Sequence, residues 1–167
     1  MLVCYSIRAL ITATVAVTAL AGEDNFKFMH SERIGALRIG MPRKDVLHVL
    51  AGTPVSGPIE LWEADGNYYQ LLDFQSLGVK IYLVSPSKSG AQIIASIRIT
   101  SPCTLATKRG IHLGSSEQDV IKLYKSQQNK EDSELGTSFV AGSVYGGLIF
   151  QFSKGKVSQI FLGPASE

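Results

Sequence analysis

The sequence predicts an α+β fold in which two tandem units, each a helix followed by antiparallel strands, form one continuous sheet with helices on one face. Segments 37–50 and 111–124 share a glycine, an Asp-Val pair and apolar positions at an offset of 74 residues. Further apolar segments match in the same order, 78–83 with 147–152 and 94–99 with 157–162. Because a helix followed by several strands is typical of α+β architecture, each copy predicts one such unit.

The first 21 residues predict a secretory signal. Arg8 is the only charge before Glu23, and an apolar run follows it. The run ends in Ala-Leu-Ala at residues 19–21, which is typical of a cleavage site. It is shorter than the roughly 20 residues that a membrane helix needs. We therefore expect cleavage after Ala21 and a periplasmic or secreted chain with no integral membrane segment; the alternative is an uncleaved anchor.

Cleavage would leave the two predicted units, residues 22–104 and residues 105–167. Cys4 would depart with the signal, so Cys103 would be the only cysteine left and no internal disulfide could form. The Ser-Pro-Cys-Thr sequence around Cys103 is typical of a connector. We expect a buried, inert thiol there, with a redox role or an intermolecular bridge as the alternatives.

Each unit is predicted to open with a helix. In the first, Pro42 suits the first helical position, and Gly52 ends the helix. In the second, Ser115 is expected to cap the helix, and Gln118 three residues later would complete a capping box. Nothing interrupts this second pattern, so the helix is expected to run on towards Lys130.

Alternating apolar residues predict the strands at 60–63, 68–74, 79–84, 93–100, 137–141, 148–152 and 157–162. Residues 65–67 and 153–155 have the composition of hairpin turns. Successive side chains of a strand point to opposite faces. We expect the inward residues to be Val79, Ile81, Leu83, Ile97 and Ile99. The outward residues are expected to be Lys80, Tyr82, Ser96, Arg98, Gln151, Gln159 and Phe161.

The helix entry Gly-Met-Pro-Arg-Lys-Asp-Val-Leu at residues 40–47, the exit Leu-Ala-Gly-Thr-Pro at residues 50–54 and the tandem copy resemble the β-lactamase inhibitor protein (BLIP) family. A single unit is also similar to the small outer-membrane assembly lipoproteins of the SmpA/BamE type. The resemblance covers most of residues 34–162. It implies either a protein that binds and blocks an enzyme or a factor in envelope assembly.

The titratable residues show no pattern of a catalytic or metal site. His30, His48 and His112 lack the spacing of metal ligands, and no phosphate-binding glycine motif is present. A solvated strand edge accounts for the carboxylates of Glu60, Glu63, Asp65 and Asp73. The net charge of +2 argues against a nucleic-acid partner. We therefore expect no catalytic residues, no metal, no cofactor and no enzyme activity.

Aromatic residues on the predicted strands form the candidate binding site, because tyrosine and tryptophan often anchor protein interfaces. The predicted protein-binding residues are Tyr68, Tyr82, Arg98, Gln151 and Phe161. The sequence thus predicts an exported protein-binding or inhibitor protein whose partner is another protein, such as an immunity protein that neutralises a toxic effector enzyme. The alternatives are an envelope-assembly or structural accessory factor, and an enzyme or small-ligand carrier with a deep pocket.

Overall fold

The computed structural model describes residues 26–165, and the predicted signal lies outside the described residues. A short helix at residues 26–31 comes first. The elements that follow are α2 (Arg43–Val49), β1 (Val55–Trp62), β2 (Asn67–Phe74), the 3₁₀ turn η1 (Gln75–Leu77), β3 (Val79–Ser85), β4 (Ile93–Ile99), α3 (Glu117–Tyr124), the 3₁₀ turn η2 (Lys125–Gln127), β5 (Ser138–Ser143), β6 (Gly146–Ser153) and β7 (Lys156–Gly163).

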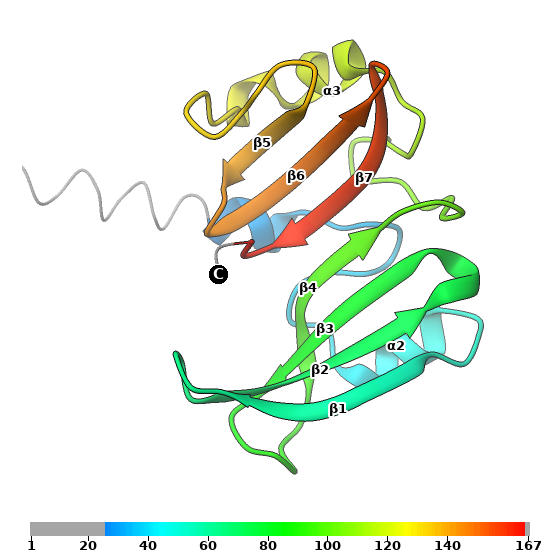
Figure 1. Ribbon diagram of the computed structural model, residues 1–167, viewed down its shortest axis with the longest axis vertical. Helices are drawn as coiled ribbons and strands as arrows, with labels where there is room; N and C mark the ends of the chain where they lie inside the picture. The colour runs from blue at the N-terminus through cyan, green and yellow to red at the C-terminus, as the bar shows by residue number, and fades with distance from the viewer. Residues whose placement is uncertain (1–25, 166–167) are drawn as a thin grey trace, which may run out of the picture.

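All seven strands belong to one sheet with the order β1-β2-β3-β4-β7-β6-β5 (Figure 1). Every neighbouring pair is antiparallel. The two groups of strands meet where β4 pairs with β7, through Ile97↔Leu162, Arg98↔Phe161 and Ile99↔Ile160. The other strand pairs align six or seven residue pairs, so the β4–β7 pairing, with three, is the shortest in the sheet.

The structure shows that the predicted fold class is wrong. The chain is mainly a single antiparallel sheet, and the helices are short and not arranged as two helix-then-strand units. Helices α2 and α3 have only 7 and 8 residues. The helix expected to continue towards Lys130 ends at Tyr124, whose ψ of 6° turns the chain into η2. The repeated motif therefore specifies similar helix starts, while the sheet supplies most of the regular structure.

The cap of α3 lies one residue later than the predicted capping box. Ser116, not Ser115, is the N-cap: its hydroxyl accepts the Asp119 N–H at 3.1 Å, and the Asp119 carboxylate accepts the Ser116 N–H at 3.3 Å. Ser115 instead accepts a hydrogen bond from the backbone of His112. In α2, Pro42 is the N-cap residue, just outside the helix in which the sequence placed it.

Six strands begin and end within two residues of their predicted limits. Strand β1 is the exception, because it begins five residues early, at Val55, and a bulge between Ser56 and Ile59 keeps it paired with β2. The turn predicted at residues 153–155 is confirmed: Lys154 has φ 52° and Gly155 φ 70°, the positive values that a tight hairpin turn requires.

The core lies on one side of the sheet. The five residues expected to point inward are all buried there, at 1% exposure or less. Val46 of α2 and both Val120 and Tyr124 of α3 are buried in the same cluster. Burial of apolar area stabilises this packing by roughly 25 cal/mol per Å². We call this side of the sheet the core face and the opposite side the outer face.

Candidate protein-binding face of the sheet

Four of the five predicted binding residues lie on the outer face. Arg98 is opposite Phe161 across the β4–β7 seam, and Phe161 is opposite Ile149 of β6. Tyr82 lies two residues beyond Lys80, the partner of Arg98 on β3. Gln151 lies two residues beyond Ile149. Because alternation keeps residues two apart on one side, the four residues share the outer face.

Tyr68, the fifth predicted residue, lies on the core face. It pairs with Ser85, which is 2% exposed, and it shares its side of β2 with the buried Leu72 and Phe74. The structure therefore does not bring Tyr68 together with Tyr82 and Arg98. Its neighbour Tyr69 takes the outer position instead.

Two residues expected to be exposed on the outer face are covered. Phe161 is 7% exposed, because β7 lies between β4 and β6 and the Arg98 guanidinium sits 5.5 Å from the centre of its ring. Ser96 is 7% exposed, because the backbone of Gly163 approaches it closely. A partner that docks at the seam would therefore meet the Arg98 side chain before the Phe161 ring.

A contiguous apolar surface crosses the first four strands on the outer face. We call it the outer aromatic patch; it comprises Trp62, Tyr69, Leu71, Tyr82 and Ile93. The rings of Trp62 and Tyr69 are 5.8 Å apart, edge to face, and Leu71 pairs with Tyr82. Trp62 is 50% exposed, Ile93 41% and Tyr82 40%. Tyr69 and Leu71 were not among the predicted binding residues, although alternation along β2 places them on the side opposite the buried Leu72 and Phe74.

Charged groups border the outer aromatic patch. The Tyr69 hydroxyl donates a hydrogen bond of 2.7 Å to the Asp65 carboxylate at the β1–β2 turn. Burial and this acidic neighbour raise the pKa of Tyr69 to about 12. Lys80 pairs with Asp73 at 3.3 Å on the other side of the patch. The patch thus has an acidic border at the hairpin turn and a mixed border towards the seam with β7.

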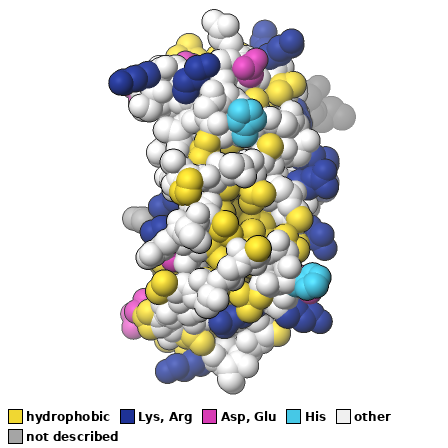
Figure 2. Space-filling view, turned by 90° about the vertical axis from the view of Figure 1, so that its right-hand side faces the viewer, with side chains coloured by type: hydrophobic (Ala, Val, Ile, Leu, Met, Phe, Trp, Pro, Cys, Tyr) yellow, Lys and Arg dark blue, Asp and Glu magenta, His cyan; other side chains and the backbone are white. Residues whose placement is uncertain are grey.

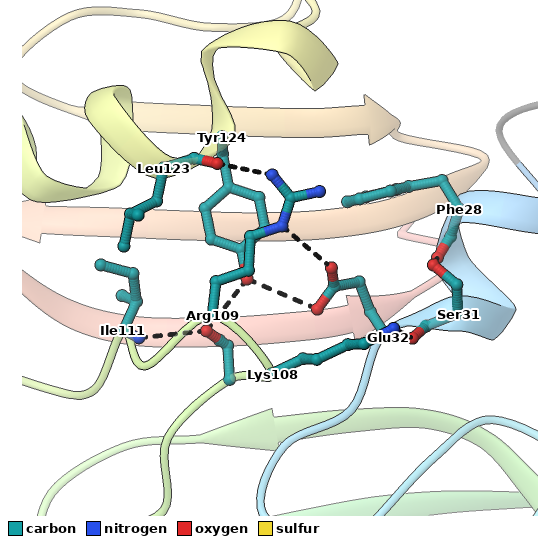
Figure 3. Close-up of polar contacts among 9 residues, drawn as sticks. Phe28, Ser31, Glu32, Lys108, Arg109, Ile111, Leu123 and Tyr124 are labelled. Atoms are coloured by element: carbon teal, nitrogen blue, oxygen red, sulfur yellow. Dashed lines mark hydrogen bonds and ion pairs between the residues drawn. The ribbon is translucent and has the colours of Figure 1, made fainter.

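The buried carboxylate of Glu32 forms an ion pair and a hydrogen bond with residues of the same chain (Figure 3). It is 2% exposed, and its oxygens lie 3.5 Å from Arg109 Nε and 3.4 Å from the Tyr124 hydroxyl. The Arg109 guanidinium stacks 4.6 Å from the centre of the Tyr124 ring and donates a hydrogen bond to the Leu123 carbonyl. These contacts fasten the N-terminal segment to α3.

We expect the free energy of unfolding of Glu32→Gln, relative to that of wild type, to increase as the pH rises above about 4.5. Burial, opposed by Arg109 and Lys108, raises the pKa of Glu32. The fold therefore favours the protonated acid, and wild-type stability is lost as the pH rises from the unfolded pKa through the folded one. Urea denaturation at several pH values measures this. A wild-type protein that instead gains stability relative to Glu32→Gln with rising pH would contradict it.

Cys103 is buried, as predicted, at 8% exposure. It lies in a groove of about 410 Å³ between the end of α2, η1 and residues 102–105. Figure 2 views the side of the molecule that carries these segments and shows apolar side chains gathered in its middle. Burial raises the pKa of the Cys103 thiol, which lowers the fraction of reactive thiolate at neutral pH.

Within residues 26–165, no three His, Cys, Asp or Glu side chains lie close enough together to hold a metal ion. None of the helices described there is long and apolar enough to cross a membrane. No family model, curated protein or solved structure matches this chain.

Proposed function

We propose that this protein is an exported inhibitor that binds another protein through the outer face of its sheet. The outer aromatic patch supports the proposal, because it leaves the rings of Trp62 and Tyr82 half exposed on regular, paired strands. Rigid aromatic side chains bury a large area at a low cost in conformational entropy, and interface hot spots are rich in Trp, Tyr and Arg. Arg98 beside the patch adds the third of these residue types.

The geometry suits occlusion of a partner better than chemistry on it. The patch is built on β1 to β4, which pair along most of their length, so a partner would meet a preformed surface. The buried carboxylate of Glu32 is held by Arg109 and Tyr124 away from this face. The resemblance to the β-lactamase inhibitor proteins favours an enzyme as the partner, and an immunity protein against a toxic effector is the specific form we propose.

The test first captures a partner protein and then compares its binding to an outer-patch variant and to a control variant. The purified chain is immobilised, proteins of an envelope extract are captured, and the captured protein is purified and titrated by calorimetry. We expect the double substitution Trp62→Ala/Tyr82→Ala to weaken binding at least about 100-fold, since hot-spot truncations cost about 2 kcal/mol or more each. Tyr145→Ala, at 68% exposure on the β5–β6 turn, is the control and should bind like wild type.

Two results would reject the proposal. A partner that binds the double variant as tightly as wild type would show that the outer aromatic patch is not the interface. A partner that is an enzyme but keeps full activity when saturated would exclude inhibition. Capture of an outer-membrane assembly protein would favour the envelope-assembly alternative.

A further inference from the structure

The end of the outer aromatic patch nearest the β1–β2 turn presents two aromatic rings. Trp62 and Tyr69 lie edge to face with their ring centres 5.8 Å apart, and Trp62 is 50% exposed. Strand β1, which carries Trp62, forms one edge of the sheet, so no strand of the sheet covers its other side (Figure 1). The face of an aromatic ring is electronegative and attracts cations, so these rings suit a positively charged group.

Three carboxylates lie around this end of the patch. Glu60 is the partner of Tyr69 across the β1–β2 pairing and therefore shares the outer face with it. Glu63 and Asp65 belong to the turn that follows Trp62. Hydrogen bonds from the Asn67 N–H at 2.9 Å and the Tyr69 hydroxyl at 2.7 Å lower the pKa of Asp65. All three carboxylates are exposed, and within residues 26–165 none of them forms an ion pair.

The basic side chains of the first four strands lie away from this end. Strands β1 to β4 contain two basic residues, Lys80 and Arg98. Lys80 is paired with Asp73 at 3.3 Å, and the Arg98 guanidinium lies 5.5 Å from the centre of the Phe161 ring at the β4–β7 seam. The outer aromatic patch is therefore negative at the turn, where neither cation of these strands neutralises it.

We propose that the partner docks on this end of the outer aromatic patch through a basic segment, with a Lys or Arg side chain across the rings of Trp62 and Tyr69. This inference rests on the proposed function, which makes the patch the interface, and it names the chemistry of the partner. The alkyl stem of a long basic side chain packs on aromatic surface while its charged end stays polar, next to Glu60 and Asp65. An acidic partner would be repelled here, and an apolar one would desolvate the carboxylates without pairing them.

The first experiment titrates the full chain with acetyl-trilysine amide and, as the probe of opposite charge, acetyl-triglutamate amide. Trp62 is the only tryptophan of the sequence, so its fluorescence reports on the patch itself. In about 10 mM salt, where charges interact over roughly 30 Å, we expect trilysine to change the emission saturably with a Kd in the millimolar range. About 0.5 M NaCl should abolish the change, and triglutamate should cause none.

Two variants with the same change in net charge locate the effect. Glu60→Gln/Glu63→Gln should weaken trilysine binding about fivefold, the loss expected for two exposed ion pairs. Glu131→Gln/Glu134→Gln, exposed residues before β5 at the opposite edge of the sheet, should bind trilysine like wild type. All four glutamates are exposed, so both variants should melt within a few degrees of wild type. Equal binding of both peptides, no response to trilysine, or equal weakening by both variants would overturn the proposal.

The captured partner separates this inference from the proposed function. We expect Glu60→Gln/Glu63→Gln to slow its association about fivefold in low salt, because charge complementarity acts mainly on the rate of encounter. A partner weakened by Trp62→Ala/Tyr82→Ala but not by the glutamine pair would overturn the basic segment alone. A partner that binds the aromatic variant as tightly as wild type would instead reject the outer aromatic patch as the interface.

Discussion

Replacing Gly78 by alanine is expected to lower the free energy of unfolding by about 3 kcal/mol or more. Gly78 ends η1 with φ 62° and ψ 32°, a left-handed conformation that strains any residue with a Cβ atom. An added Cβ would overlap the Thr100 carbonyl oxygen and lie 2.9 Å from the backbone nitrogen of Pro102. Backbone atoms cannot rotate away as a side chain can, so the start of β3 or the end of β4 would have to move.

Gly66→Ala is the matched control for this prediction. Gly66 has φ 72°, yet nothing lies within 4 Å of the Cβ atom that alanine would add. Only the backbone strain of about 1–2 kcal/mol should then appear. Urea denaturation of the two variants measures the difference. Equal losses in both would show that the close approach of residues 100–102 to Gly78 does not constrain the fold.

Replacing Tyr124 by alanine is expected to lower the free energy of unfolding by about 3–5 kcal/mol. Its side chain is fully buried, and its ring centre lies 5.2 Å from that of Phe150. The hydroxyl is 3.0 Å from Thr107 Oγ1. Alanine would leave a large cavity and would also deprive Arg109 of the ring on which it stacks.

Two further variants divide this effect into its parts. Tyr124→Phe keeps the ring and should cost only about 1–2 kcal/mol, because it loses the hydroxyl contacts with Thr107 and Glu32. Tyr145→Ala removes an exposed tyrosine and should change stability by less than about 0.5 kcal/mol. Thermal and urea unfolding supply the values. A Tyr124→Ala variant as stable as Tyr124→Phe would refute the cavity argument.

Local sequence determined most of the strands and the last hairpin turn of this protein, with β1 as the exception. Alternation in 79–84 predicted correctly that Val79, Ile81 and Leu83 point to the core, because a strand has a strict period of two residues. The glycine after Lys154 predicted the last hairpin turn, because the positive φ that such a turn needs is a property of single residues. Both signals are local, and packing elsewhere did not override them.

Tertiary structure decided the properties that depend on distant residues. Helix α3 ends at Tyr124, where the chain turns into η2, although no local sequence signal ends the helix there. Alternation placed Phe161 on the outer face correctly but could not foresee its burial, because its cover comes from Arg98 on a strand more than 60 residues away. The sequence by itself thus determined which way the side chains of β3 and of Arg98 and Phe161 point, whereas only the assembled sheet decided which of them a partner can reach, since accessibility depends on neighbours that alternation does not encode.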